Sequence, residues 1–298
     1  MTDKDKKTEF LPDTQLDRRD LLTGAAGMAA ALFGGQAVAG AHRSAPIELT
    51  AEDKIAKPVG EGAQVLVTGA NRGLGFEFTK QYAARGAKVI ATARKPERAE
   101  ALNALAAENP NIVVERLDVT DHAQIEELAA KYVDTPIDLL LNNAGIGGGI
   151  ENQFFGKMNY DTFDLVMDVN VKGPMKMCEA FRKNVENSNL KKMVTVSSSQ
   201  GSISQVRSPL LYWYRCSKSA VNMCMVNLAY AVQRKKVIVG LVTPGATATD
   251  FIPEPFRKQI EGIQTPEQAT TDMVRNIDRF SVANTGTFFD YTGEIVPW

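Results

Sequence analysis

The chain has 298 residues, 44% of them hydrophobic, which is enough for one large α/β domain or two small ones. Its 34 lysines and arginines nearly balance 35 acidic residues, so the charge gives no indication of nucleic-acid or anionic-membrane binding. Three cysteines are too few for a disulfide framework, and two histidines offer little to a metal ion or a Ser-His-Asp hydrolase. We therefore expect chemistry on a small molecule, with no metal and no nucleic-acid partner.

The first 41 residues are predicted to be a targeting segment. Arg18 and Arg19 precede a weakly apolar, Ala- and Gly-rich run at 24–41, which resembles a twin-arginine export signal ending in small residues. The alternative is a membrane anchor or an unstructured tail, although the glycines of this run disfavour a stable transmembrane helix. Residues 42–61 are predicted to be a linker and residues 62–298 one domain. We expect a periplasmic protein exported in the folded state, or a membrane-anchored one if the segment is not cleaved.

From residue 64 onward, short apolar runs alternate with helical patterns. Strands are expected at 65–67, 89–91, 112–114, 137–141, 193–196 and 237–242, and helices at 74–85 and 96–108. This alternation predicts right-handed βαβ crossovers and a single α/β domain of the Rossmann type, with a doubly wound, mostly parallel sheet and helices on both faces. Thr265, Pro266 and Gln268 predict a capped helix start near the C-terminus.

The first predicted strand runs into a glycine-rich loop at residues 68–75, which opens the first helix. Gly69, Gly73 and Gly75 permit a tight turn and let backbone N–H groups approach a pyrophosphate at the positive end of the helix. Glycines also close ordinary strand-to-helix turns. The strand before this loop and the helix after it favour nucleotide binding.

The end of the second predicted strand indicates which dinucleotide binds. An acidic residue there favours NAD, and a basic one accommodates the 2′-phosphate of NADP. The strand ends at Arg94 and Lys95 with no acid, and Arg72 lies inside the glycine loop, so two guanidinium groups could hold a phosphate. We expect NADP(H), with NAD(H) as the alternative if Arg94 and Lys95 are solvated loop charges.

Tyr214 and Lys218 lie four residues apart in a run that is predicted to be helical. On a helix this spacing places the phenol and the ammonium on one face, where the cation can lower a phenol pKa that is ordinarily about 10. A tyrosine tuned in this way exchanges a proton near neutral pH. The spacing alone also occurs on many amphipathic helices, so the rest of the chain decides its meaning.

The motifs of this chain occur in the order of the short-chain dehydrogenase/reductase family, which the chain resembles from about residue 63 to its C-terminus. Besides the glycine loop and the Tyr214–Lys218 pair, the resemblance rests on Asp118, the run 142–145, Asn170, Ser198 and the pair 244–245. Within the family, the residues around Tyr214 and at 287–298 resemble the carbonyl-reductase, sniffer and C-factor branch.

The resemblance implies a catalytic tetrad of Asn170, Ser198, Tyr214 and Lys218. Tyr214 would exchange a proton with the substrate oxygen, and Ser198 would position that oxygen. Lys218 would hold the nicotinamide ribose and lower the phenol pKa, and Asn170 would anchor a water that relays protons through Lys218. Three adjacent serines ending a strand are commonly turn formers, and the family spacing to Gly201 selects Ser198 among them.

The resemblance also implies cofactor contacts spread over several loops. Asn142 is expected to be structural, and Asp118 could instead cap a helix or form an Asx turn. The gap from Ser198 to Tyr214 is longer than is usual in the family, and the extra residues are expected within 202–212, in the loop over the substrate. The stretch 250–262 is either a lid over the substrate or a surface helix. The expected cofactor-binding residues are Gly69, Asn71, Arg72, Gly73, Leu74, Gly75, Arg94, Asp118, Val119, Asn143, Ala144, Gly145, Lys218, Pro244, Gly245, Thr247 and Thr249.

These features together predict an NADPH-dependent oxidoreductase that reduces an aldehyde or ketone to an alcohol. One alternative is an NAD-dependent alcohol dehydrogenase working oxidatively. Another is a non-catalytic dinucleotide-binding signalling protein of the C-factor type, against which the intact tetrad argues. The family resemblance further implies a homodimer or homotetramer.

Overall fold

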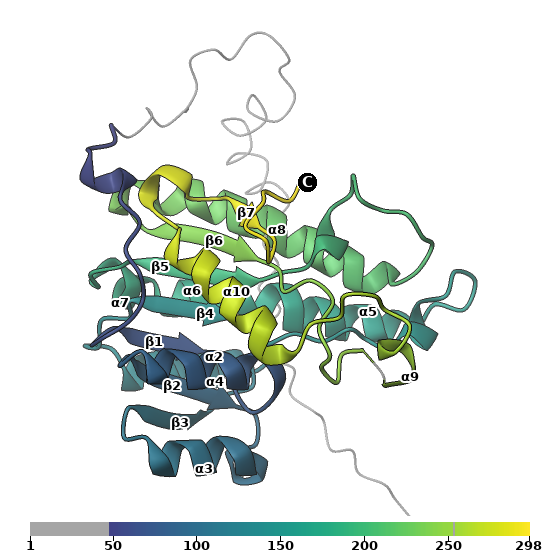
Figure 1. Ribbon diagram of the computed structural model, residues 1–298, viewed down its shortest axis with the longest axis horizontal. Helices are drawn as coiled ribbons and strands as arrows, with labels where there is room; N and C mark the ends of the chain where they lie inside the picture. The colour runs from purple at the N-terminus through teal and green to yellow at the C-terminus, as the bar shows by residue number, and fades with distance from the viewer. Residues whose placement is uncertain (1–47, 253) are drawn as a thin grey trace, which may run out of the picture. The chain divides into compact units, whose positions relative to one another are not determined.

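The computed structural model describes residues 48–252 and 254–298, with residues 49–298 forming one compact unit (Figure 1). Residues 49–61 of the predicted linker therefore belong to the same unit as the predicted domain. The twin-arginine segment and residues 42–47 lie outside the described residues. None of the helices in the described part of the chain has the length and hydrophobicity needed to cross a membrane.

Seven strands form one sheet in the order β3-β2-β1-β4-β5-β6-β7, and every pairing is parallel. The chain builds outward from β1 to β3 and then returns to place β4 on the other side of β1, so the direction of winding reverses between β1 and β4. This is the predicted Rossmann-type α/β fold. The strands are β1 Gln64–Val67, β2 Lys88–Ala93, β3 Ile112–Arg116, β4 Leu139–Asn142, β5 Lys192–Val196, β6 Ile238–Val242 and β7 Phe288–Phe289.

Helices cover both faces of the sheet, which is why the central strands read as continuous apolar runs. Along β1, Val65 and Val67 join one buried cluster, whereas Leu66 joins the cluster on the opposite face. Side chains of α2, α3 and α10 complete the first cluster, and those of α4, α6 and α8 the second; Figure 1 shows α2 and α10 side by side across one face. The helices are α2 Gly73–Ala84, α3 Glu100–Glu108, α4 His122–Lys131, α5 Tyr160–Met167, α6 Gly173–Ala180, α7 Arg182–Glu186, α8 Tyr212–Val232, α9 Glu254–Arg257 and α10 Pro266–Asp278.

The helix predicted at 96–108 is in fact two elements, a 3₁₀ turn at Pro96–Arg98 and α3. Ala99 lies between them with φ −93° and ψ 59°, outside the helical region, and is buried in the first core cluster. The Asn103 side chain donates to the Pro96 carbonyl oxygen at 2.8 Å. Tertiary packing and this hydrogen bond therefore override the local helix pattern. By contrast, the capping box predicted at Thr265 is present at the start of α10.

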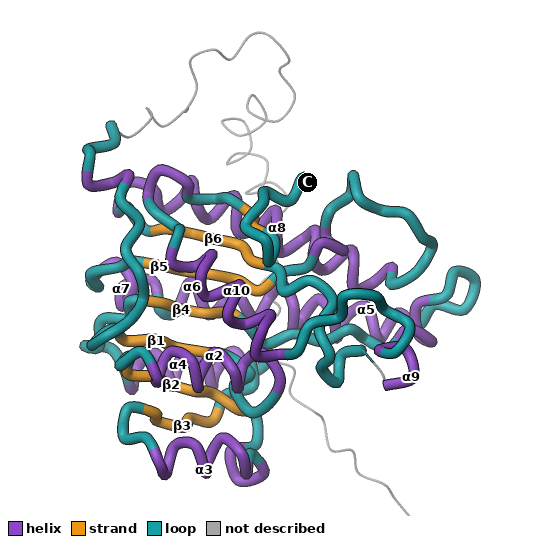
Figure 2. The backbone as a smooth tube through the Cα atoms, in the orientation of Figure 1, coloured by secondary structure: helices purple, strands orange, loops and turns teal. Residues whose placement is uncertain are grey.

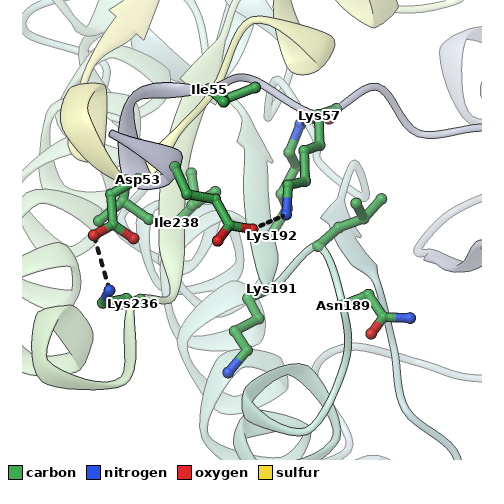
Figure 3. Close-up of a pocket in the computed structure, with 11 residues that line it drawn as sticks. Asp53, Ile55, Lys57, Asn189, Lys191, Lys192, Lys236 and Ile238 are labelled. Carbon is green, nitrogen blue, oxygen red and sulfur yellow. Dashed lines mark hydrogen bonds and ion pairs between the residues drawn. The ribbon is translucent and has the colours of Figure 1, made fainter. Parts of the chain in front are cut away.

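The segment before β1 is held at the amino-terminal edge of the sheet by charged groups. The buried Lys192 ammonium donates to the carbonyl oxygens of Lys57 (2.6 Å) and Ile277 (2.9 Å), and Asp53 pairs with Lys236 at 2.8 Å. Figure 3 shows these side chains around a cavity of about 220 Å³. Because Lys192 and Ile238 are the first residues of β5 and β6, this cavity lies at the edge opposite the loops that follow the strands.

Candidate active site

The predicted site residues meet at the carboxyl edge of the sheet, although they are far apart in the sequence. Because the strands are parallel, the loops that follow β1, β4, β5 and β6 emerge at the same edge, and Figure 2 shows α5 and α9 beyond those strand ends. This edge includes the point between β1 and β4 where the winding reverses, the usual ligand crevice of an open α/β sheet.

The glycine loop between β1 and α2 is built so that backbone atoms approach closely. Gly69 and Gly73 have φ values of +68° and +55°, in the left-handed region that glycine adopts without strain. A Cβ atom at Gly75 would lie 2.1 Å from the Gly69 carbonyl oxygen and 2.5 Å from Nδ2 of Asn143. Any other residue would break this turn, so the loop requires glycine as predicted.

Thr68 joins the loops after β1 and β4, a role that the sequence analysis did not identify. Its hydroxyl group accepts hydrogen bonds from the amides of Asn143 and Ala144, both at 3.0 Å, and its side chain is buried. In return, the side-chain amide of Asn143 donates to the carbonyl oxygens of Thr68 (2.9 Å) and Gly69 (3.3 Å). The only local signal for Thr68 is its position as the first residue of the glycine loop.

Tyr214 and Lys218 lie on the same face of α8, as the four-residue spacing predicts, and both are buried. The Lys218 ammonium lies 5.8 Å from the centroid of the Tyr214 ring and donates to the Val196 carbonyl oxygen at 3.0 Å. Burial lowers the pKa of Lys218 to about 8.

The structure does not bear out the expectation that Lys218 brings the phenol pKa toward neutrality. Burial raises the pKa of Tyr214 to about 12, and a hydrogen bond with Ser198 lowers it only in part. The loss of hydration outweighs the stabilisation that the phenolate receives from its neighbours. Tyr214 therefore holds its proton throughout the neutral range.

Ser198 is the serine beside the Tyr214 phenol. Ser197 instead turns toward the buried side chain of Asn222 and hydrogen-bonds to it. The Ser198 hydroxyl group also accepts from the Gln200 amide at 3.2 Å, so it forms the turn expected of a serine at a strand end as well.

Asn170 lies in a π-helical turn, Asp168–Lys172, between α5 and α6. Its side chain accepts from the Ile146 amide and donates to the Ile146 carbonyl oxygen, both at 2.9 Å, and donates to the Ser217 hydroxyl group at 3.0 Å. A Cβ atom at Gly145 would lie 3.3 Å from Oδ1 of Asn170 and 3.6 Å from Nζ of Lys218. The loop after β4, the π-turn and α8 thus converge on one point, as expected where a π-turn marks a functional site.

Asp118 and Asn142 make the structural contacts that were considered for them, while the contact of Asp118 with the cofactor stays a prediction. Asp118 accepts from the amide (3.0 Å) and the hydroxyl group (2.7 Å) of Thr120 in an Asx turn, while Asp121 is the N-cap of α4. Asn142 is buried and donates to Cys178 Sγ at 3.3 Å and to Thr195 Oγ1 at 3.5 Å, which joins β4 to its neighbours as predicted.

The two arginines expected to read the 2′-phosphate lie in different surroundings. Arg94 is exposed at the end of β2, and no ion pair to it is found among residues 48–252 and 254–298. Arg72 is also exposed but pairs with Asp250 at 2.8 Å. This pair links the glycine loop to the segment after β6.

The remaining expected cofactor residues line the same edge with different degrees of burial. Leu74 is partly buried and packs against the first core cluster, whereas Val119 is buried in the second. Thr249 lies near the glycine loop, since a Cβ atom at Gly73 would lie 3.5 Å from its methyl group. Thr247 hydrogen-bonds to the Pro244 and Gly245 carbonyl oxygens at 3.5 and 3.4 Å, so this loop closes on itself.

The segment 250–262 covers the tyrosine in this structure. The Phe251 ring lies 4.9 Å from the Tyr214 ring, centroid to centroid, and a Cβ atom at Gly147 would lie 2.9 Å from Phe251. Arg257 in α9 donates to the Thr249 and Ile252 carbonyl oxygens at 2.7 Å and so fixes the turn that carries Phe251. The position of Phe251 supports the lid interpretation of this segment.

These residues fit a dinucleotide. The glycine loop at the start of α2 leaves no room for side chains, so backbone amides are free to approach an anion, and exposed arginines flank it. In the part of the chain that the structure describes, no group of three or more His, Cys, Asp or Glu side chains is arranged to bind a metal ion.

Comparison with known proteins identifies the family to which the chain belongs. Residues 63–259 match the family model for short chain dehydrogenases, and the chain belongs to this family. It is 30% identical to 1-hydroxy-2-glutathionyl-2-methyl-3-butene dehydrogenase of Rhodococcus sp. (strain AD45), over 78% of this chain and 99% of that protein. The protein is an enzyme, a short-chain NAD(P)(H)-dependent dehydrogenase/reductase.

Solved structures agree with this assignment. An NADPH-bound carbonyl reductase from chicken fatty liver superposes with a TM-score of 0.71 at 27% identity, covering 80% of this chain and all (100%) of that one. A short-chain dehydrogenase/reductase from Burkholderia multivorans with bound NADP gives 0.69 at 28% identity over the same shares of 80% and 100%.

Replacing Thr68 with valine tests the connection between the two loops. The change keeps the side-chain shape but leaves the partly buried amides of Asn143 and Ala144 without their acceptor. We expect a loss of about 1–3 kcal/mol in the free energy of unfolding, measured by urea denaturation, together with weaker NADPH binding in a fluorescence titration. Thr68→Ser, which keeps the hydroxyl group, should retain NADPH affinity; equal affinity in Thr68→Val would contradict the role given to Thr68.

Proposed function

We propose that the enzyme reduces an aldehyde or ketone to an alcohol with NADPH. The observation that carries this proposal is the meeting of the Tyr214 phenol with Ser198 and with the Lys218 ammonium, 5.8 Å from the ring centroid, under Phe251. Similarity at 27% identity to a carbonyl reductase that binds NADPH supports both the reaction and the cofactor.

Reduction of a carbonyl group needs a proton donor at its oxygen and a fixed position for its carbon. Tyr214 donates the proton, since its pKa of about 12 keeps the phenol protonated at neutral pH. Ser198 hydrogen-bonds to the same oxygen and holds it in reach of the phenol. A bound reduced nicotinamide supplies the hydride to the carbon.

Lys218 and Asn170 help to position the cofactor and the backbone around Tyr214. Lys218 offers its remaining N–H donors to the nicotinamide ribose while one N–H group stays on the Val196 carbonyl oxygen. Asn170 holds Ile146 and Ser217, and the Ser217 hydroxyl group donates to the Tyr214 carbonyl oxygen at 2.8 Å. The water relay through Asn170 and Lys218 stays a prediction.

Preference for NADPH rests on cations at the end of β2 and in the glycine loop. Arg94 is exposed there and can receive a 2′-phosphate directly. Arg72 would exchange Asp250 for the phosphate, and an ion pair between exposed side chains contributes only about 0–1 kcal/mol. Loss of the Arg72–Asp250 ion pair therefore costs less free energy than a bidentate contact between Arg72 and the phosphate would provide.

Tyr214→Phe tests the proton donor. We expect kcat to fall by about 10²–10⁴-fold, because the variant lacks the hydroxyl group that protonates the substrate, while the Kd for NADPH stays within twofold. The measurement is loss of nicotinamide absorbance with NADPH or NADH and para-nitrobenzaldehyde, cyclohexanone or menadione. Tight NADPH binding without any turnover by the wild type would favour the signalling alternative, and faster turnover with NADH would contradict the cofactor preference.

The pH dependence of reduction tests the state of Lys218. Its pKa of about 8 means that the ammonium is present below that pH and is lost above it, whereas Tyr214 stays protonated up to about 12. We expect kcat/KM for reduction to be level from about pH 6 to 7 and to fall as the pH rises through 8. Whatever activity Lys218→Arg retains should show no such fall, because arginine keeps its charge. A level wild-type profile to pH 10 would contradict this assignment.

We further propose that the enzyme is exported in the folded state with its cofactor bound. The proposal is motivated by the arginine pair at 18–19 and the small-residue run that follows it. N-terminal sequencing of the protein from the periplasmic fraction should begin near residue 40 or 42, and an intact Met1 in that fraction would overturn the cleaved signal. Assembly as a homodimer or homotetramer stays a prediction from the family.

A further inference from the structure

The helix that carries the catalytic tyrosine begins with a residue that cannot cap it. Leu211 precedes α8 in the left-handed conformation, with φ 60° and ψ 40°, and has no side-chain oxygen to accept from the first-turn amides. A residue other than glycine is strained in this conformation and keeps it only where its surroundings impose it. The amide of Tyr214, third in the helix, is one of those that need an acceptor from outside the helix.

Gln153 supplies that acceptor from 61 residues away in the sequence. Its side-chain oxygen accepts from the Tyr214 amide at 3.0 Å, and its side-chain nitrogen donates to the carbonyl oxygens of Gly147 (2.7 Å) and Gly149 (2.8 Å). Gln153 is fully buried. A carboxamide has one acceptor oxygen and two N–H donors, so these three bonds use its oxygen and both donors.

The loop that Gln153 holds forms one wall of the site. Ile146, at its start, is bound by Asn170, and Gly147 lies against Phe251, which covers the Tyr214 ring. Gly148 and Gly149 have φ values of +78° and +71°, so the loop has little preference for this shape by itself. Gln153 therefore connects the glycine-rich residues 147–149, which have little conformational preference of their own, directly to the backbone of Tyr214.

We propose that Gln153 is a positioning residue, which fixes the Tyr214 phenol relative to the wall formed by residues 147–149. The proposal rests on the proposed function, since it assumes that Tyr214 protonates a substrate held against that wall. A displacement of about 1 Å at a reacting group can cost about 100-fold in rate. Loss of Gln153 should thus act on the chemical step, although Gln153 touches neither substrate nor cofactor.

Gln153→Leu removes all three hydrogen bonds while keeping a side chain of similar size. We expect kcat with NADPH and para-nitrobenzaldehyde to fall about 10- to 100-fold, with the Kd for NADPH within twofold of the wild type. Asn152→Leu is the matched control, because Asn152 donates to the Gly148 carbonyl oxygen of the same loop at 3.0 Å and makes no hydrogen bond to Tyr214. Its kcat should stay within threefold, and a kcat for Gln153→Leu that also stays within threefold would overturn the proposal.

A double-mutant cycle separates positioning of Tyr214 from general support of the fold. In the Tyr214→Phe background there is no phenol to position, so adding Gln153→Leu should leave the residual kcat unchanged. A residue that only stabilises the fold would lower the residual kcat by the same factor as in the wild type, and that result would also overturn the proposal. If the leucine variant fails to fold, Gln153→Glu extends the test. The protonated glutamic acid side chain can still accept from the Tyr214 amide and donate to one carbonyl oxygen. The activity of Gln153→Glu should therefore recover as the pH falls.

Amide hydrogen exchange tests the hydrogen bond between Gln153 and the Tyr214 amide without requiring enzymatic turnover. Exchange in a peptide covering residues 212–215 should become faster in Gln153→Leu than in wild type and Asn152→Leu, while exchange at residues 219–229 stays unchanged. Unchanged exchange at 212–215 would refute the cap. A wild type that turns over no carbonyl compound, combined with the expected exchange result, would refute the reductase function and leave the cap at Tyr214 supported.

Discussion

The burial of one charged group, the Lys218 ammonium, constrains the whole carboxyl edge of the sheet. A buried cation is costly unless its N–H donors find oxygen atoms, and the Val196 carbonyl oxygen at the end of β5 is one such partner. This contact joins α8 to the end of β5. It also requires open space on the other side, where Gly145 leaves room that a side chain would fill 3.6 Å from the ammonium. The position of Tyr214, one helical turn earlier, then follows from the geometry of α8.

Much of the fold could be predicted because its signals are local. Strand positions, the alternation of strands and helices and the capping box at Thr265 each follow from a few neighbouring residues, and all appear in the structure. The glycine loop was predictable for the same reason, since its glycines and the close contact between Gly75 and Gly69 lie within eight residues, whereas its contacts with Asn143 and Thr249 do not. The predicted helix at 96–108 failed where packing of Ala99 in the core decides the backbone.

The parts of the site that could not be predicted depend on contacts between distant residues. Thr68 and Asn143 are 75 residues apart, and Gln153 and Tyr214 are 61 apart, so neither hydrogen bond leaves a pattern in a local window of sequence. The pairing of Arg72 with Asp250 spans 178 residues and depends on how the segment after β6 folds back over the glycine loop. The phenol pKa was misjudged for a related reason. Spacing shows that a cation is near, but only the structure shows how thoroughly the tyrosine is buried.

This burial determines the protonation state of Tyr214 at neutral pH. A phenol with a pKa of about 12 is a poor base at neutral pH, because almost none of it is ionised, yet it is always loaded with the proton that a developing alkoxide requires. Oxidation of an alcohol would need the phenolate, whose formation the buried surroundings oppose. The Lys218 ammonium, with a pKa of about 8, is present in the same pH range in which the phenol is protonated. Both groups are therefore in the protonation states that the proposed carbonyl reduction uses at neutral pH.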